Sequence, residues 1–311
     1  MSEPAFIAGD WGTSNLRLAL CDHDGRALET RKGPGAAESR GRFAETFDQL
    51  TREWRTGQEL PALLCGMVGS AFGWREAAYL PSPAEPGELV DALVSPRQGV
   101  SIVPGMRCTN PLGAPDVMRG EETQLLGALG GLAPGLDAGR HLVCLPGTHT
   151  KWVSVQSGLV QEFLTVPSGE LFALLCDHSV LVRDPQTVVI HRAAEFELGL
   201  QQAARHPEIP VLHKLFQARS LRLDQQLAPD GAASWLSGLL IGTDVAGAMQ
   251  VFPESERRAP VYVIGAPHLT EAYSIALTRA GLQARAIDGE ASSLAGLSWL
   301  HRELARRAES T

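Results

Sequence analysis

Two turns of matched sequence hold most of the residues that could do chemistry in this chain. The first, Gly12-Thr13-Ser14-Asn15, follows a short apolar strand that ends in Asp10, and the second is Pro146-Gly147-Thr148-His149-Thr150-Lys151. Each turn is preceded by an apolar strand and followed by an alternating one. Glycines, hydroxyl groups and backbone N–H groups in such turns suit phosphate oxygens. The repeat therefore predicts two half-domains that hold one polyphosphate, as an ATP-using enzyme with a cleft would.

Asp10 stands where its carboxylate can face a metal ion while the turn amides face phosphate oxygens, which predicts Mg²⁺ bound together with a nucleotide. The alternative is an ordinary hairpin in which Asp, Ser and Asn side chains bond the backbone of the turn. A second matched turn disfavours that alternative, because hairpin chemistry alone does not require it. Pro146 stands near the position of Asp10 in the second copy, so only the first lobe supplies a carboxylate at the end of a strand.

Lys151 and His149 are candidates for contacts to the nucleotide. Lys151 is one of three lysines, and it could pair with a phosphate or extend from the hairpin into solvent. His149 could contact the ligand, although a histidine in a turn more often bonds the neighbouring backbone. Both residues are therefore kept as cofactor-binding candidates beside Gly147 and Thr148.

Glu121 and Glu122 begin a predicted helix directly after Arg119-Gly120. Acidic residues are favoured at helix N-termini by the helix dipole, which is the structural explanation for the pair. A carboxylate at the junction of two lobes could instead deprotonate a substrate hydroxyl. The sequence leaves both explanations open, and it does not decide which of the two residues would be the base.

Polar residues beside predicted turns are candidates for substrate contacts. The segment GMVGSAFGW at 66–74 combines glycines that allow close approach with a hydroxyl and an indole, and it could wall a polar substrate. Each residue of this kind is more often structural than functional when taken alone. The candidates are Gly69, Ser70, Trp74, Asn15, Arg17 and Glu170.

Gly265-Ala266-Pro267 follows an apolar strand and precedes a predicted helix. In an open α/β sheet, a nucleotide base or ribose can lie against the backbone at such a place. A tight strand-to-helix turn is the plain structural alternative. We therefore take Gly265 and Ala266 as candidates for adenosine contacts.

Composition limits the classes of partner. The 311 residues carry a net charge of −8, with 27 basic and 35 acidic residues, which disfavours binding to nucleic acid or to an anionic membrane and favours a small-molecule substrate. The five cysteines are widely spaced without a CxxC pair, and no apolar run is long enough to span a bilayer. These features predict a cytoplasmic protein with free thiols. The sequence does not determine the oligomeric state, and a homodimer is one option.

Several common catalytic motifs are missing from the sequence. It has no GxxxxGK[ST] segment, no GxGxxG after a strand, no GxSxG and no HExxH. The chain therefore lacks the motifs that define P-loop, Rossmann, α/β-hydrolase and zincin enzymes.

Hydrophobic patterning predicts alternating strands and helices in two lobes. Strands are expected at 5–10, 15–21, 61–68, 100–104, 261–264 and 283–287, with a hairpin at 142–155. Helices are expected at 42–55, 121–129, 193–205, 232–252, 269–280 and 290–306. The segments at 81–99 and 108–115 are expected to be irregular connections, the first with one possible short helical turn near Glu88–Leu93. We place the N-terminal lobe at 1–120 and the C-terminal lobe at 121–311.

The quoted motifs resemble a known family. The paired hairpins and the late glycine turn resemble the phosphate-1, phosphate-2 and adenosine elements of the acetate and sugar kinase, Hsp70 and actin superfamily. The strings DWGTSNLR at 10–17, VMRGEETQLLGA at 117–128 and PGTHTKWV at 146–153 are more closely similar to the 2-dehydro-3-deoxygalactonokinase family. The superfamily resemblance implies an α/β fold with two ribonuclease-H-like lobes, mixed sheets flanked by helices, and an ATP cleft between the lobes.

The family resemblance also implies a reaction, a transferase step in galactonate catabolism. ATP, with Mg²⁺, would phosphorylate the 6-hydroxyl of 2-dehydro-3-deoxy-D-galactonate. By position, Glu121 resembles the aspartate that opens a helix and acts as base in related sugar kinases, with Glu122 as the second choice. Gly265-Ala266-Pro267 departs from the glycine pair common in the superfamily. The alternatives are another sugar or sugar-acid kinase of the superfamily and a non-catalytic ATP-binding regulatory protein.

Overall fold

The chain forms two compact units, neither of which is continuous in sequence. The computed structural model describes residues 3–182, 193–228 and 230–309. Unit 1 comprises residues 1–139, 155–163 and 287–311, and unit 2 comprises 140–154 and 164–286. Two α/β units agree with the predicted fold class, but the division differs from the predicted single boundary after residue 120. The chain returns to unit 1 at its C-terminal end, which a single boundary cannot describe.

Unit 1 is built on a six-stranded sheet with the order β3-β2-β1-β4-β7-β6, and it also holds a three-stranded sheet with the order β5-β8-β9. The strands are β1 (Phe6–Trp11), β2 (Asn15–Cys21), β3 (Ala27–Pro34), β4 (Ala62–Gly66), β5 (Tyr79–Pro81), β6 (Val94–Arg97), β7 (Val100–Ile102), β8 (Gly105–Thr109) and β9 (Pro115–Met118). The helices are α1 (Phe43–Thr51), α2 (Pro86–Asp91), α3 (Glu121–Gly127) and α10 (Gly289–Glu309), with short η1 (Met67–Gly69) and η2 (Ala128–Leu132) turns.

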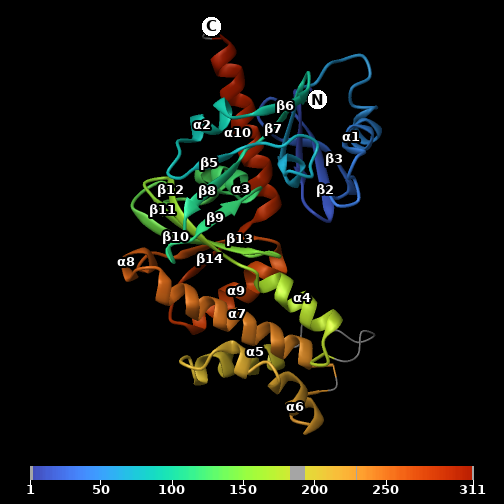
Figure 1. Ribbon diagram of the computed structural model, residues 1–311. Helices are drawn as coiled ribbons and strands as arrows, with labels where there is room; N and C mark the ends of the chain where they lie inside the picture. Colours follow the sequence, from blue (N-terminus) through green and yellow to red (C-terminus); the bar gives the residue numbers. More distant parts are fainter. Residues whose placement is uncertain (1–2, 183–192, 229, 310–311) are drawn as a thin grey trace. The chain divides into compact units, whose positions relative to one another are not determined.

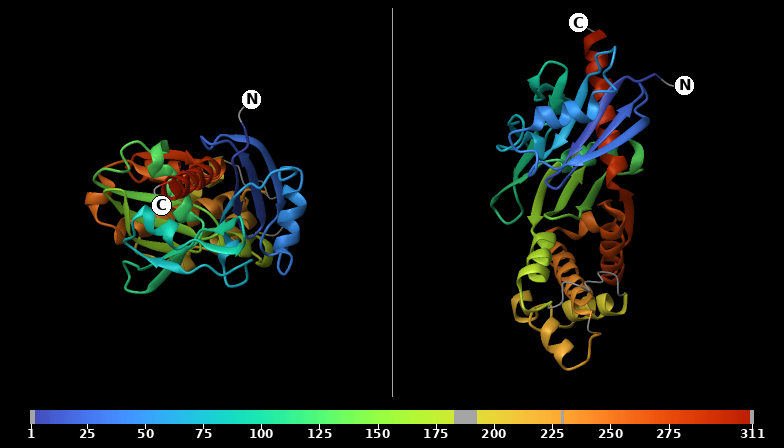
Figure 2. Two further views of the ribbon diagram at one scale, coloured as in Figure 1. Left: turned by 90° about the horizontal axis from the view of Figure 1, so that it is seen from above. Right: turned by 90° about the vertical axis from the view of Figure 1, so that its right-hand side faces the viewer.

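Helices cover both faces of the β1–β4 part of this sheet. Side chains alternate between the faces of a strand, so Ile7 and Trp11 of β1 join the core beneath α1, whereas Phe6 and Ala8 join the core beneath α10. The left-hand view of Figure 2 shows α1 and α10 on opposite sides of these strands. Asp10 has the same parity as Phe6 and Ala8, so its side chain lies on the α10 face.

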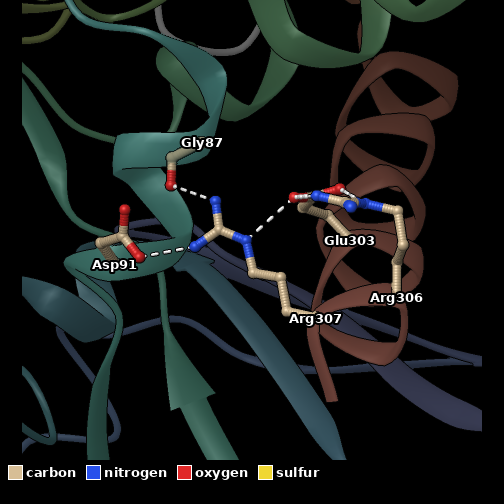
Figure 3. Close-up of polar contacts among 5 residues, drawn as sticks. All are labelled: Gly87, Asp91, Glu303, Arg306 and Arg307. Carbon is tan, nitrogen blue, oxygen red and sulfur yellow. Dashed lines mark hydrogen bonds and ion pairs between the residues drawn. The ribbon is translucent and has the colours of Figure 1, made fainter. Parts of the chain in front are cut away.

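Helix α10 is fixed to unit 1 along its length. Near its start, a side chain on Gly296 would overlap the carbonyl oxygen of Thr123 in α3, so the two helix backbones are in direct contact. Near its end, Arg307 donates to the Gly87 carbonyl (3.1 Å) and pairs with Asp91 (2.5 Å), both in α2, and also with Glu303 of its own helix (2.9 Å; Figure 3). The C-terminal helix is thus an integral part of unit 1.

Unit 2 contains most of a five-stranded sheet with the order β12-β11-β10-β13-β14. Its strands are β10 (Arg140–Leu145), β11 (Thr150–Gln156), β12 (Leu159–Val166), β13 (Val261–Gly265) and β14 (Ala284–Asp288). Its helices are α4 (Ser168–His178), α5 (Ala193–Arg205), α6 (Gln217–Leu223), α7 (Ala232–Val251), α8 (Glu254–Arg257) and α9 (Pro267–Arg279), with the turn η3 (Val211–His213) (Figure 1).

The two large sheets share the order of their first four strands. In each, the third, second and first strands are followed by the fourth, and the first strand is parallel to the fourth: β1 to β4 and β10 to β13. The matched hairpins of the sequence are β1–β2 and β10–β11. The repeat read from the sequence is therefore a repeat of topology, and it places each predicted turn at the carboxyl end of a first strand.

Most predicted elements are present within two or three residues, and the largest differences lie in unit 1. Strands β8 and β9 include only the two ends of the irregular connection predicted at 108–115. Helix α2, which overlaps the short helical turn predicted near 88–93, and β6 lie within 81–99. In the described part of the chain, no helix is long and apolar enough to span a bilayer.

Candidate active site

Asp10 lies one residue before the end of β1, where the parallel strands β1 and β4 finish together. It is opposite Cys65 in the parallel register and Arg17 in the antiparallel one. Ser293 of α10 donates to its Oδ2 (3.1 Å). Burial raises the pKa of the Asp10 carboxyl, and the Ser293 hydrogen bond and the Arg17 charge oppose that shift.

Gly66 explains how the chain leaves space beside this carboxylate. Its φ is +88°, a conformation that favours glycine, and a side chain there would lie 2.8 Å from the Trp11 carbonyl oxygen and 3.5 Å from Asp10 Oδ1. Gly120, with φ +106°, packs over Gly66 and turns the chain into α3. Two glycines thus bring the start of α3 to the end of β1.

Glu121 and Glu122 begin α3 in different surroundings. Glu122 is only 2% exposed; its carboxylate accepts the backbone N–H of Gly120 (2.7 Å) and the hydroxyl of Thr123 (3.0 Å). Burial, followed by the charge of Glu121, raises the pKa of Glu122 to about 8. A buried carboxyl that keeps its proton near neutral pH is poorly suited to accept another one.

Glu121 is half-buried, and its carboxylate accepts the backbone N–H of Arg119 (2.9 Å). Its charge contributes to the raised pKa of Asp10, so the two carboxylates are electrostatic neighbours. Of the two glutamates, Glu121 therefore has the accessible carboxylate beside Asp10.

The predicted phosphate-1 turn is exposed and firmly held. Gly12 N–H donates to the Asn15 carbonyl (2.9 Å), and the carbonyls of Gly12 and Thr13 accept N–H groups from Ala36 and Ala37 (2.9 and 3.1 Å). Thr13, Ser14 and Asn15 are exposed. The turn is thus a supported loop whose side chains face solvent next to the Asp10 strand.

The other candidates in unit 1 are Gly69, Ser70, Trp74 and Arg17, and their surroundings differ. Ser70 is buried, and Gly69 packs so closely that a side chain there would lie 2.9 Å from Arg119 Nη1. The Trp74 ring is tilted against Phe47 in the α1 core (centroids 5.8 Å apart). Arg17 is exposed and pairs with Glu290 of α10 (2.5 Å). The structure brings Gly69 and Ser70 to Arg119 at the start of α3, whereas the Trp74 ring packs against core residues.

Unit 2 brings its predicted residues together around the phosphate-2 turn. The Thr148 carbonyl accepts the N–H of Glu170 (2.9 Å), and His149 Nε2 pairs with Glu170 Oε2 (2.9 Å). A side chain on Gly169 would overlap the Gly147 carbonyl. Glu170, predicted as a substrate contact, therefore lies beside the nucleotide candidates Gly147, Thr148 and His149.

Gly265 ends β13 next to this turn. A side chain there would lie 3.3 Å from the carbonyl oxygen of Pro146, so the predicted adenosine turn and phosphate-2 turn are neighbours within unit 2. Ala266 is exposed before α9. Lys151, in contrast, is 5% exposed, so most of its side chain lies inside unit 2.

A pocket of about 500 Å³ opens between α5, α7 and the first turns of α9. His268 and Leu269 follow directly after the predicted adenosine turn, and Phe196, Ile241 and Ile275 give the pocket an apolar lining. Such a pocket suits a flat heterocycle. Sequence analysis did not find these lining residues, because three separate helices supply them and only His268 and Leu269 adjoin a motif.

The geometry at Asp10 is compatible with Mg²⁺ bound through a nucleotide. Within the described residues there is no group of three or more His, Cys, Asp or Glu side chains that would form a metal site made of protein alone. Mg²⁺ in nucleotide sites is commonly held by one or two carboxylates, phosphate oxygens and water. Asp10 Oδ1, on the side kept open by Gly66, fits that donor set.

Comparisons with known proteins identify the family of this chain. The family model described as 2-keto-3-deoxy-galactonokinase matches residues 10–300. The Rhizobium meliloti (strain 1021) protein named "Probable 2-dehydro-3-deoxygalactonokinase DgoK1" is 36% identical over 302 residues, covering 94% of this chain and 95% of the relative. The Escherichia coli (strain K12) protein named 2-dehydro-3-deoxygalactonokinase is 34% identical over 296 residues, covering 94% and 96%.

A solved structure extends the agreement to three dimensions. The crystal structure of a Sinorhizobium meliloti protein assigned as a 2-dehydro-3-deoxygalactonokinase has 34% sequence identity and a TM-score of 0.84, covering 96% of this chain and 99% of that one. The chain therefore belongs to the 2-keto-3-deoxy-galactonokinase family, as its sequence motifs indicated.

Proposed function

We propose that the protein transfers the γ-phosphoryl group of ATP to the 6-hydroxyl of 2-dehydro-3-deoxy-D-galactonate in the cytoplasm. The observation that carries this proposal is the pair formed by Asp10 and Glu121, one carboxylate suited to Mg²⁺ and a second, accessible one suited to a hydroxyl proton. Family membership supports the choice of substrate.

We assign different tasks to the two units. In unit 2, the Gly147–His149 turn would bind phosphate oxygens, and the pocket beside Gly265-Ala266 would take the adenine. In unit 1, Asp10 and the exposed turn at 12–15 would serve the reacting phosphates, with the sugar acid near Gly69 and Ser70.

In the proposed reaction, Glu121 accepts the proton of the 6-hydroxyl as the oxygen bonds to the γ-phosphorus, and the bond from that phosphorus to the β–γ bridging oxygen breaks to release ADP. Mg²⁺, when bound, would neutralise charge on the phosphates. Ser293 holds Asp10 Oδ2, which leaves Oδ1 directed to the open side.

A substrate panel tests the activity. ADP release should be measured with 2-dehydro-3-deoxy-D-galactonate, its gluconate epimer and unmodified aldonates. We expect the highest kcat/KM with the galactonate compound. Higher kcat/KM with another acid would make the protein a different sugar-acid kinase of the superfamily, and ATP binding without transfer to any acceptor would favour a regulatory protein.

Replacing Asp10 tests the metal assignment. Asp10→Asn should keep the fold but lose most turnover, because an amide is a poorer Mg²⁺ ligand than a carboxylate and the loss falls on the charged transition state. The measurement is kcat at saturating ATP over a Mg²⁺ titration, with circular dichroism as the folding control. Near-normal kcat would remove Asp10 from this role.

A further inference from the structure

Beneath the phosphate-2 turn lies a buried cluster of polar side chains that the proposed reaction does not use. Asp244 of α7 accepts hydrogen bonds from Trp152 Nε1 (2.8 Å) and from the Tyr273 hydroxyl of α9 (2.6 Å). The Tyr273 oxygen also lies 3.0 Å from Thr150 Oγ1 of β11 and 3.1 Å from Ser168 Oγ of α4, and those two hydroxyls are 2.7 Å apart. We call these five residues the hydroxyl network.

The direction of the hydrogen bonds in this network follows from its chemistry. The Trp152 indole N–H can only donate, and it donates to Asp244 Oδ1, while the Tyr273 hydroxyl donates its single proton to Asp244 Oδ2. The Thr150 and Ser168 hydroxyls lie within hydrogen-bonding distance of each other and of the Tyr273 oxygen, which can therefore accept a proton from either of them. Each of the three hydroxyl protons therefore has an acceptor inside the network.

The network is fully enclosed. All five residues are at most 9% exposed, with Thr150 and Trp152 at 0%. Burial raises the pKa of Asp244, while the hydrogen bonds from Tyr273, Trp152 and Ser168 oppose that shift. Buried polar groups that are all satisfied fix a single arrangement of the backbone segments that carry them.

Those segments are the ones assigned to the nucleotide. Thr150 directly follows His149 of the phosphate-2 turn, and Ser168 directly precedes Gly169, which packs on Gly147. Tyr273 lies on α9, the helix that begins just after the predicted adenosine turn at 265–266. Each of the two turns assigned to the nucleotide is therefore followed by a member of the network, Thr150 directly after His149 and Tyr273 seven residues after Ala266.

We infer that the hydroxyl network is a positioning device that holds the phosphate-2 turn in register with the adenosine turn. Its members do not contact the nucleotide; they set where the backbone amides of the turn lie. This inference rests on the proposed function for the assignment of the two turns. If these residues only stabilised the fold, replacing them would lower stability, and it would not weaken the binding of ATP more than the binding of adenosine.

The chain offers a matched control on the same strand. Ser154, also on β11, donates a buried hydrogen bond to Glu256 of α8 (2.9 Å). Ser154 and Glu256 are each 3% exposed. Removing this hydroxyl costs a buried hydrogen bond of the same type at the far end of the strand from the phosphate-2 turn.

The experiment compares Thr150→Val, Thr150→Ser, Tyr273→Phe and Ser154→Ala in the full chain. Calorimetry gives the affinities for ATP and for adenosine, steady-state assays give kcat and the KM of each substrate, and thermal melting gives stability. Thr150→Val and Tyr273→Phe should weaken ATP binding by about 5- to 10-fold and lower kcat by about 10-fold, with adenosine affinity within about 2-fold of wild type. Thr150→Ser should restore both, and Ser154→Ala should lower only the melting temperature.

Equal losses of ATP and adenosine affinity, or wild-type kinetics in both network variants, would overturn the inference, as would a Ser154→Ala variant with the same kinetic defect. If Thr150→Val does not fold, Tyr273→Phe carries the test, because its ring can keep its place beside Trp152 (centroids 6.2 Å apart). The binding measurements need no sugar acid. A wild-type protein that phosphorylates none of the acids would defeat the proposed function while leaving this comparison intact.

Discussion

Two adjacent glutamates at one helix start have opposite chemical character. Neighbouring residues on a helix point about 100° apart, so Glu121 and Glu122 cannot both face one substrate. Glu122 points into the interior, where Gly120 and Thr123 hold its carboxyl. Glu121 keeps partial exposure beside Asp10. This difference supports the proposal that Glu121, rather than Glu122, accepts the substrate proton.

Substitution of each glutamate tests this assignment. Glu121→Gln should lower kcat by roughly two to four decades with little change in the directly measured Kd of the sugar acid, since the lost group acts in the transition state. Glu122→Gln should act mainly on stability or substrate positioning. A large chemical defect in Glu122→Gln alone would reverse the roles, and normal turnover in both variants would exclude a carboxylate base at this helix.

The buried Glu122 also predicts how stability depends on pH. Its pKa is about 8 in the folded chain against an ordinary value of 4.5, so between these values the folded chain keeps a proton that the unfolded chain has lost. The stabilisation that this group contributes to the free energy of unfolding is fully present below pH 4.5. It decreases as the pH rises, and the total loss reaches roughly 3–5 kcal/mol above pH 8.

Urea unfolding at pH 5, 6, 7 and 8 measures this effect. The Glu122→Gln variant should show a flatter profile than wild type, because its amide does not titrate. Parallel profiles for the two proteins would mean that Glu122 ionises normally in the folded state.

The sequence predicted residues that belong to local motifs and missed those that depend on distant contacts. Asp10 and Gly147 could be found because strand, turn and strand follow one another along the chain. Ser293, which holds Asp10, and Tyr273, which supports Thr150, stand in helices far along the sequence. The residues next to them in sequence form no recognisable motif. Only the packing of the helices brings these hydroxyls to Asp10 and Thr150.

At the scale of elements, the position of α3 depends on α10. A side chain on Gly127 would overlap the carbonyl oxygen of Ser292, as one on Gly296 would overlap that of Thr123. Close backbone contact at two points fixes the helix whose first residues are Glu121 and Glu122. The proposed base is therefore positioned by a helix from the other end of the chain.

Gly127→Ala should destabilise unit 1 by roughly 2–4 kcal/mol, because the overlap is with backbone that cannot move aside cheaply. Gly130→Ala is the matched control: no atom lies within 4 Å of the added carbon, so it should change stability by less than about 1 kcal/mol. Denaturant unfolding of both variants provides the measurement. Equal stabilities would show that α3 and α10 can separate without cost.

The elements themselves were predictable where hydrophobic periodicity was strong. Helix α5 was predicted with its observed bounds and α7 to within one residue, since long apolar patterns specify type and length. Strands β8 and β9 were missed because each is short and they flank the turn-forming residues Asn110 to Gly113, which dominate the local pattern. Pairing between such short strands is decided by tertiary contacts rather than by propensity.

At the scale of the whole molecule, the nucleotide and the sugar acid should protect different segments of the backbone. Backbone hydrogen exchange should slow at 146–151 and 265–270 when ADP and Mg²⁺ bind, and at 66–74 and 119–122 when the sugar acid is added. This expectation follows from the tasks assigned to each unit. Protection by the sugar acid that is confined to unit 2 would contradict the assignment. A nucleotide that has been shown not to bind, for example GMP, serves as the control.

The interrupted course of unit 1 has a consequence for biosynthesis. One face of its main sheet is covered by Leu297 and Leu300 of α10, which the ribosome produces only after all of unit 2. The nascent chain must therefore carry Phe6, Ala8 and Cys65 without their final cover while residues 140–286 are translated. Unit 2 can complete its own core during that time, whereas unit 1 must finish folding after it. Slower translation would lengthen the period in which this apolar surface is available to chaperones.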